Sequence, residues 1–144
     1  MATNDLIAEA AIDVDADVDR VWRALVDPEE IRRYMFGTSV VSDWKPGSRI
    51  VWKGEWEGKA YEDHGVIREI EAPRRISYTH FSPLTGQPDV PENYHTVTIE
   101  LAPTGTGTHL RLTQDNNPTE EAREHSRKNW SMMLEGLKKQ VEGS

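Results

Sequence analysis

Two histidines and a tyrosine are the side chains of this sequence with the clearest capacity for chemistry. Tyr78 and His80 alternate in one apolar stretch, and His95 opens another. Histidine titrates near neutral pH, so either ring could give or take a proton during a reaction. The sequence places no Asp or Glu beside His80 or His95 to orient it, and a neighbouring hydroxyl or backbone group could equally satisfy each ring. Catalytic residues therefore stay unassigned.

The spacing of candidate metal ligands gives no support for a metal site. Glu121 and His125 lie four residues apart, but one pair of ligands is not a site. The alternating acids from Asp13 to Asp19 lack the glycine of a calcium loop, because Val18 stands there, and helix capping explains them better. We expect no metal and no cofactor. The five histidines have no close ligand spacing: His64, His80, His95, His109 and His125.

The longest periodic stretch runs from Pro118 to Glu142 and predicts a helix of about six or seven turns. Pro118 suits the first turn, where a missing N–H costs nothing. Lys138 and Lys139 near the end complement the helix dipole. An apolar stripe along this helix needs a broad surface to pack against. The stripe consists of Ala122, Ser126, Trp130, Met133, Leu134, Leu137 and Val141.

Most of the chain between Lys45 and Asn116 alternates apolar and polar residues, as strands do. A half-buried strand over residues 6–14 comes before this region, followed by two short helices, one after Asp17 and one from Pro28. Residues 82–93 form the longest loop and the best candidate for a mobile flap. Six further strands are expected at 38–44, 49–56, 60–71 with a bulge near Gly65, 75–81, 94–101 and 109–115.

This order of elements predicts an α+β fold. It contains no parallel crossover pattern, so the sheet should be mainly antiparallel. A curved sheet of about seven strands, wrapped around the long C-terminal helix, satisfies the need of both to bury an apolar face. No repeat, linker or low-complexity segment is present, so residues 1–144 should form a single domain.

Strand alternation also predicts which side chains face the space between sheet and helix. An apolar cavity with a few polar groups at its end is the usual form of a small-molecule site. The alternative is that the aromatic side chains fill the core completely. The candidate ligand-binding residues are Trp52, Trp56, Tyr78, His80, His95, Gln114, Trp130 and Met133.

The composition disfavours several classes of function. The net charge of -8 and the isoelectric point near 5.1 disfavour a nucleic-acid partner, which would need a basic face. The acidity also disfavours an anionic membrane surface, and no apolar run is long enough to insert into a membrane. There is no cysteine and no signal pattern, so we expect a cytoplasmic protein without disulfides. The sequence leaves a homodimer open.

Short motifs spread over nearly the whole chain carry a resemblance to a known family. The most specific is GVIREI at 65–70, followed by PRRISYT at 73–79. Others are VWRALVDP at 21–28, WKPGSR at 44–49, GTHLRLT at 107–113 and the pair Asn129-Trp130. In this order they resemble the AHSA-type branch of the START-like, birch-pollen-allergen-like helix-grip superfamily, also called SRPBCC. The sequence departs from that branch at Ser48, His80 and Asn129, where a glycine, a tryptophan and a glycine are usual.

The resemblance implies a scaffold with a cavity between sheet and helix, but members differ in function. Some carry lipids, others are hormone receptors, polyketide cyclases or chaperone activators. We therefore expect a binding protein for a small hydrophobic ligand such as a lipid, polyphenol or polyketide. A cyclase or hydrolase using His80, His95 or Tyr78 is the first alternative. Activation of a heat-shock ATPase is the second, disfavoured because a single domain has no second segment to bridge a chaperone.

Overall fold

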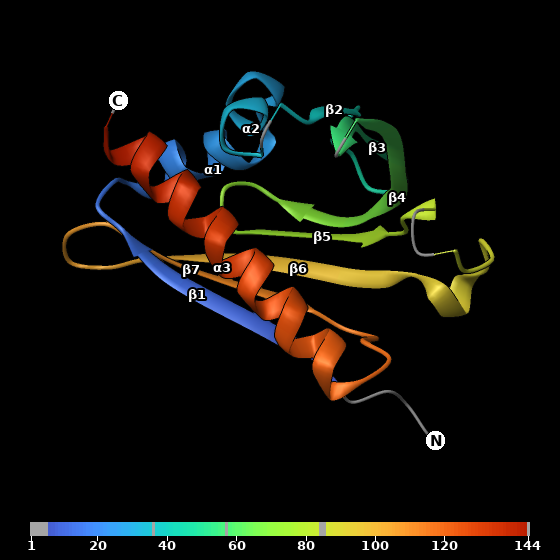
Figure 1. Cartoon of the computed structure of the whole chain (residues 1–144). Coiled ribbons are helices and arrows are strands. Elements are labelled where there is room, and N and C mark those ends of the chain that lie inside the picture. Colours follow the sequence, from blue (N-terminus) through green and yellow to red (C-terminus); the bar gives the residue numbers. More distant parts are fainter. Residues whose placement is uncertain (1–5, 36, 57, 84–85, 144) are drawn as a thin grey trace.

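The computed structural model describes residues 6–35, 37–56, 58–83 and 86–143 (Figure 1). Seven antiparallel strands form one sheet, and a long C-terminal helix, α3 (Glu120–Glu142), crosses one face of it. The predicted α+β helix-grip architecture is confirmed. None of the helices within the described residues is long and apolar enough to cross a membrane.

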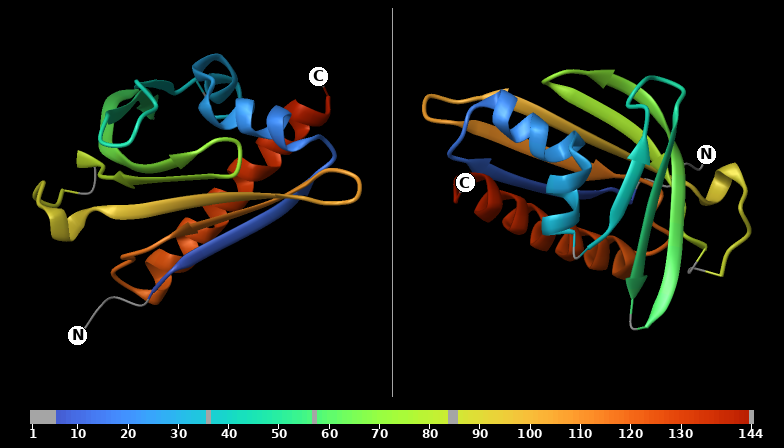
Figure 2. Two further views of the ribbon diagram at one scale, coloured as in Figure 1. Left: turned by 180° about the vertical axis from the view of Figure 1, so that it is seen from behind. Right: turned by 90° about the horizontal axis from the view of Figure 1, so that it is seen from above.

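The sheet has the strand order β1-β7-β6-β5-β4-β3-β2, which leaves β1 and β2 at its edges. It is strongly twisted, and β2, β3 and β4 run in a different direction from β1, β6 and β7 (Figure 2). The strands are β1 (Ala8–Val14), β2 (Ser39–Ser42), β3 (Arg49–Trp56), β4 (Lys59–Glu71), β5 (Arg75–His80), β6 (His95–Pro103) and β7 (Thr108–Gln114).

Alternation in the β6–β7 hairpin correctly predicts its buried face. Each of these residues keeps less than a tenth of its surface exposed, and they pack in the main hydrophobic core. Their burial removes apolar surface from water, which is the main source of stability in the sheet. The buried residues of the hairpin are Val97, Ile99, Leu101, Leu110 and Leu112.

Strand β4 contains the predicted irregularity, slightly later than expected. Its register against β5 shifts between Ile67 and Glu69 rather than at Gly65. Gly65 has a different role, because a Cβ built there would lie 1.7 Å from the backbone oxygen of Thr79. The glycine therefore allows β4 and β5 to approach closely.

Two short helices follow β1, as predicted. The helix α1 (Val18–Val26) begins after Asp17, whose carboxylate accepts a hydrogen bond from the backbone N–H of Arg20 at 2.8 Å. The helix α2 (Pro28–Tyr34) begins after Asp27, which accepts from the N–H of Glu29 at 3.0 Å. The cap at Asp17 gives one residue of the acidic run a structural role. Both helices contact α3 (Figure 1).

Helix α3 starts two residues later than predicted. Thr119 is its N-cap and accepts a hydrogen bond from the N–H of Ala122 at 3.0 Å, so Pro118 precedes the cap instead of entering the first turn. The apolar stripe is buried only in its second half, at Leu134, Leu137 and Val141. The first half of the stripe is only partly buried, and this is where a cavity opens.

Candidate functional site

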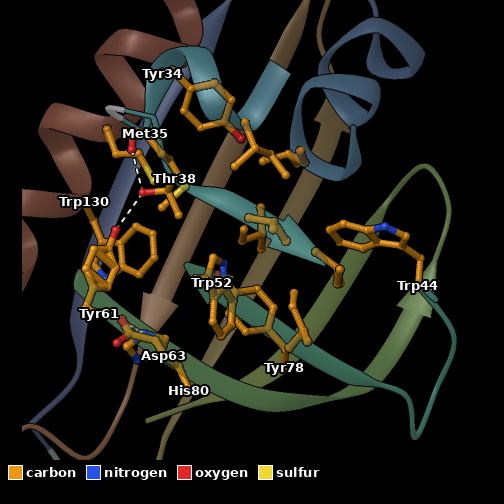
Figure 3. A pocket seen from close by; sticks show the side chains of 17 residues that line it. Tyr34, Met35, Thr38, Trp44, Trp52, Tyr61, Asp63, Tyr78, His80 and Trp130 are labelled. Atoms are coloured by element: carbon orange, nitrogen blue, oxygen red, sulfur yellow. Dashed lines mark hydrogen bonds and ion pairs between the residues drawn. The ribbon is translucent and has the colours of Figure 1, made fainter. Parts of the chain in front are cut away.

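Two adjoining cavities lie between the first half of α3, the inner face of the sheet and the segment after α2, and Figure 3 shows the inner one. The inner chamber, about 90 Å³, is bounded by residues that include Trp44, Trp52, Asp63 and Tyr78. The outer chamber, about 380 Å³, is bounded by residues that include His95 and others from the loop after β5 and from α3. The chambers share six lining residues, so they adjoin each other. The shared residues are Met35, Thr38, Tyr61, His80, Trp130 and Met133.

Aromatic rings form much of the inner chamber. The rings of Trp52 and Tyr78 have centroids 5.3 Å apart and are tilted by 47°. Burial raises the pKa of the Tyr78 hydroxyl far above its ordinary value, so this group stays neutral. Trp44 also lines the chamber and has φ 57°, a backbone conformation that is uncommon for a residue with a large side chain. Residues in such uncommon backbone conformations are frequent at functional sites, where the surrounding structure stabilises the conformation.

A chain of hydroxyl groups lies where the two chambers meet. The hydroxyl of Thr38 donates to the backbone oxygen of Met35 at 2.7 Å, since a carbonyl can only accept. The Tyr61 hydroxyl is 2.7 Å from the Thr38 oxygen and must therefore be the donor in that pair. The Tyr61 ring lies across Gly54 on β3, where a Cβ would come within 3 Å of three of its atoms. Tyr61 thus presents its oxygen to the cavity as an acceptor.

Asp63 on β4 orients His80 on β5. The His80 Nε2 and the Asp63 Oδ2 are 3.0 Å apart, and the two side chains keep 28% and 15% of their surface exposed. A carboxylate only accepts hydrogen bonds, so Nε2 of His80 carries a proton and donates it to Asp63. Trp52 packs edge-on against the His80 ring at 4.9 Å. The other oxygen of Asp63, Oδ1, is buried and has no hydrogen-bond partner within the described part of the chain.

His95 faces the outer chamber as the neutral form. Its Nδ1 donates to the backbone oxygen of Asp115 at 2.9 Å, which leaves Nε2 as an acceptor. Burial lowers the pKa of His95, and the nearby His80 lowers it further, while the hydrogen bond to Asp115 opposes the shift. The two imidazole rings are stacked with centroids 6.4 Å apart.

A side-chain network holds Trp130 in the wall of both chambers. Its indole N–H donates to Oε1 of Gln114. The amide nitrogen of Gln114 in turn lies 3.4 Å from Asn117 Oδ1 and from Ser126 Oγ. Because its amide oxygen accepts the hydrogen bond from Trp130, Gln114 fixes the position of the indole ring and also lines the outer chamber.

Comparison with known proteins identifies the family. Residues 15–142 match the family model described as "Activator of Hsp90 ATPase homolog 1-like protein", AHSA1. The chain belongs to this family. The match covers most of the chain and agrees with the resemblance of the sequence motifs to the AHSA-type branch of the SRPBCC superfamily. None of the curated proteins matches the chain.

Solved structures show the same AHSA1-like architecture. The protein ChR145 from Cytophaga hutchinsonii is 57% identical, with a TM-score of 0.87 over 99% of this chain and 97% of that one. CalU16 from Micromonospora echinospora is 24% identical, with a TM-score of 0.73 over 98% and 87%. DynU16, a putative protein in the dynemicin biosynthetic locus, is 16% identical, with a TM-score of 0.80 over 96% and 48%. At these lower identities the similarity to CalU16 and DynU16 shows the fold alone.

The structure brings most of the predicted site residues of this AHSA1-like chain to the cavity. Trp52 and Tyr78 line the inner chamber, and His95 and Gln114 the outer one. The side chain of Trp56 lies outside the part of the chain that is described. The remaining predicted residues line both chambers: His80, Trp130 and Met133.

Sequence reasoning missed many residues of the cavity wall, and four of them form part of its polar network or of the junction. On β4, Tyr61 and Asp63 alternate with exposed residues and share a face with the buried Gly65, so strand alternation could have found them. Met35 and Thr38 lie in the irregular segment after α2, where no periodic pattern exists. Within the described residues no three His, Asp or Glu side chains gather as metal ligands.

Proposed function

We propose that this AHSA1-like protein binds a small, largely apolar molecule in the two adjoining chambers. The observation that carries the proposal is that two chambers adjoin beneath the first half of α3, with six residues lining both. The outer chamber alone, at about 380 Å³, falls within the size range of small-molecule pockets, and its lining combines aromatic rings and two methionines with a larger number of polar side chains. Lipids, polyphenols and polyketides are candidate ligands of suitable character.

Two neighbouring methionines on α3 provide a matched test of this site. Met133 lines both chambers, whereas Met132 is 61% exposed on the other side of the helix. A tryptophan at 133 would fill the junction of the chambers, and the same substitution at 132 would not. Both variants add equal apolar volume to the same helix, so they separate filling of the cavity from general effects on α3.

We expect ligand-detected NMR to find binders in a mixture of neutral lipids, flavonoids and aromatic polyketides. Met133→Trp should weaken their binding by about tenfold or more, since overlap with a filled pocket removes contacts worth above 1 kcal/mol. Met132→Trp should bind like the wild type. Absence of binding across all three compound classes would reject the proposal. Equal affinity of both variants would place the ligand elsewhere.

An acid–base enzyme is the second candidate, favoured by the Asp63–His80 hydrogen bond. A pocket-facing histidine oriented by a carboxylate is the arrangement that general acid–base catalysis requires. Once a ligand is known, its conversion should be followed by mass spectrometry with the wild type and with His80→Gln. Loss of turnover with retained binding would support catalysis. A ligand recovered unchanged from the wild type would reject it.

Activation of a heat-shock ATPase stays a prediction that rests on the family name alone. ATPase and pull-down assays with a cytoplasmic heat-shock ATPase test it directly. Absence of both binding and stimulation would remove this function from consideration. Cytoplasmic location and a homodimeric state also stay predictions.

A further inference from the structure

The charged groups around the cavity are all acidic. Asp63 lines the inner chamber and Glu55 the outer one. Among the described residues that line either chamber there is no lysine or arginine. A carboxylate or phosphate ligand would therefore lose its hydration without gaining a countercharge, which is strongly unfavourable. A cationic ligand would meet complementary charge.

Polar groups near the junction of the chambers already use their protons. The hydroxyl of Tyr61 donates to Thr38, and His80 donates to Asp63. His95 donates from Nδ1 to a backbone oxygen, and the indole N–H of Trp130 donates to Gln114. Near the junction these groups leave acceptors for a ligand: the Tyr61 oxygen, the carboxylate of Asp63 and Nε2 of His95. A ligand that supplies hydrogen-bond donors fits this set.

Asp63 is the least satisfied of these acceptors. A carboxylate can accept about four hydrogen bonds. Oδ2 of Asp63 accepts a hydrogen bond from His80, and the buried Oδ1 has no partner within the described residues. An unpaired buried carboxylate oxygen is costly, and a charged donor brought beside it would recover that cost. Asp63 lines the inner chamber, so a charged donor bound there would meet the charge of its carboxylate.

The aromatic walls add a second reason to expect a cation. Trp52, Tyr61 and Tyr78 line the same chamber as Asp63, and Trp130 lines both chambers (Figure 3). The faces of aromatic rings attract cations, more so where water is excluded. Resting on the proposed function, we infer that the ligand is an organic ammonium ion. Its protonated nitrogen lies at the Asp63 carboxylate and its apolar body extends into the outer chamber.

Three compounds with one body and different head groups test the charge preference. 3-Phenylpropylamine, 3-phenylpropan-1-ol and 3-phenylpropanoate are titrated into the isotopically labelled protein at about pH 8, where an ordinary imidazole is neutral and an alkylamine is protonated. The amine should bind about tenfold tighter than the alcohol, because it adds a charge-assisted hydrogen bond and ring contacts. The carboxylate should bind most weakly.

Two neighbouring acids on β4 provide matched variants. Asp63→Asn removes the charge at the chamber, while Glu62→Gln removes the same charge from an exposed position on the strand. We expect Asp63→Asn to bring the amine to the affinity of the alcohol, with the affinity for the alcohol retained. Glu62→Gln should keep the preference for the amine. If Asp63→Asn does not fold, intermolecular NOEs in the wild type between the methylene beside the amine nitrogen and the Tyr61 and His80 rings replace it.

Each of the other possible results rejects a specific part of the proposal. Equal or tighter binding of the alcohol or the carboxylate rejects an ammonium ligand, while binding of a hydrophobic body as proposed above still holds. Retention of the amine preference in Asp63→Asn, or NOEs to other residues in the wild type, rejects the role of Asp63. If none of the three compounds shifts a resonance of the cavity residues, the ammonium ligand is rejected. If the neutral lipids, flavonoids and polyketides also fail to bind, both proposals are rejected.

Discussion

At the scale of single residues, the direction of each hydrogen bond in the cavity wall determines whether a ligand meets a donor or an acceptor. Tyr61 donates its hydroxyl proton to Thr38, and Thr38 donates its own to the Met35 carbonyl. The hydroxyl oxygen of Tyr61 is therefore left as an acceptor in the cavity wall. Gly54 makes this arrangement possible, since any larger residue would collide with the Tyr61 ring. Small changes at these positions would alter which groups a ligand meets without changing the fold.

His95 gives a prediction about pH at this scale. Its pKa lies below the ordinary value of 6.5, first because burial disfavours the charged ring. The unfolded chain then binds this proton more readily, so the free energy of unfolding should fall as the pH drops below about 6.5 toward the folded pKa. His95→Asn keeps an N–H donor and cannot titrate. Urea denaturation between about pH 7.5 and pH 5 should show a shallower decline for the variant.

An NMR titration of the ring proton of His95 provides the control for this prediction. The midpoint should lie below that of an ordinary histidine, about 6.5. A midpoint at or above that value would contradict the assignment of His95 as a neutral residue. Such a midpoint would also mean that Nε2 of His95 is not available as an acceptor in the outer chamber.

At the scale of elements, β4 connects the cavity with the loop after β5. Its inner face carries Tyr61 and Asp63, and the neighbouring His64 holds the loop from the other side. His64 Nε2 lies 3.0 Å from the Asp89 carboxylate and 2.9 Å from the Tyr94 hydroxyl, which also donates to Asp89. Burial and the hydrogen bond to Asp89 raise the pKa of Tyr94 to about 12. The loop predicted to be a mobile flap is thus tied to the strand that builds the site.

Close approach of β4 and β5 leads to a prediction about two glycines. In Gly65→Ala the new Cβ would meet the backbone oxygen of Thr79, and backbone atoms in a paired strand cannot move aside. We expect a loss of about 3 kcal/mol in the free energy of unfolding, the upper part of the usual range for overpacking. Gly105→Ala is the control, because nothing lies within 4 Å of its Cβ position. Urea denaturation of both variants measures the difference; similar losses would refute the close-contact argument.

At the scale of the whole molecule, one buried carboxylate joins the three α-helices. Glu30 on α2 keeps only 4% of its surface exposed. It accepts from both terminal nitrogens of Arg20 on α1, at 2.9 and 3.1 Å, and from Gln140 on α3 at 2.8 Å. Burial opposes ionisation, but the hydrogen bonds from Gln140 and Arg20 outweigh it and lower the pKa of Glu30. The cluster therefore fixes the short helices against the long one.

Glu30→Gln should destabilise the molecule by about 1–3 kcal/mol at neutral pH, as expected for losing hydrogen bonds to a charged group. A lowered carboxyl pKa contributes stability above about pH 4.5 that is lost as the pH falls through the folded value, so the variant should also lose less stability in acid. Glu29→Gln, which removes an exposed charge on the same helix, is the control. Urea denaturation of the wild type and of both variants at about pH 7 and pH 3.5 measures these losses in the free energy of unfolding. An equal acid response of Glu30→Gln and the wild type would contradict the prediction.

The sequence by itself determined the elements and the faces they bury. Apolar residues repeat with the period of a helix in α3 and of a strand in β6 and β7, and both periods are local properties of the chain. Caps at Asp17 and Asp27 were readable for the same reason, because a cap and its helix are neighbours in sequence. The strand alternation that predicted Tyr78 and His80 as site residues is likewise a local pattern of the chain.

Only the tertiary structure decided how those faces combine. Asp63 and His80 are 17 residues apart, and their hydrogen bond depends on the register between β4 and β5, which shifts beside Ile67. The contact of Trp130 with Gln114 likewise depends on the angle at which α3 crosses the sheet. Local patterns do not encode register, crossing angle or the space left between a helix and a sheet. These are set by the packing of the whole molecule, and the cavity follows from them.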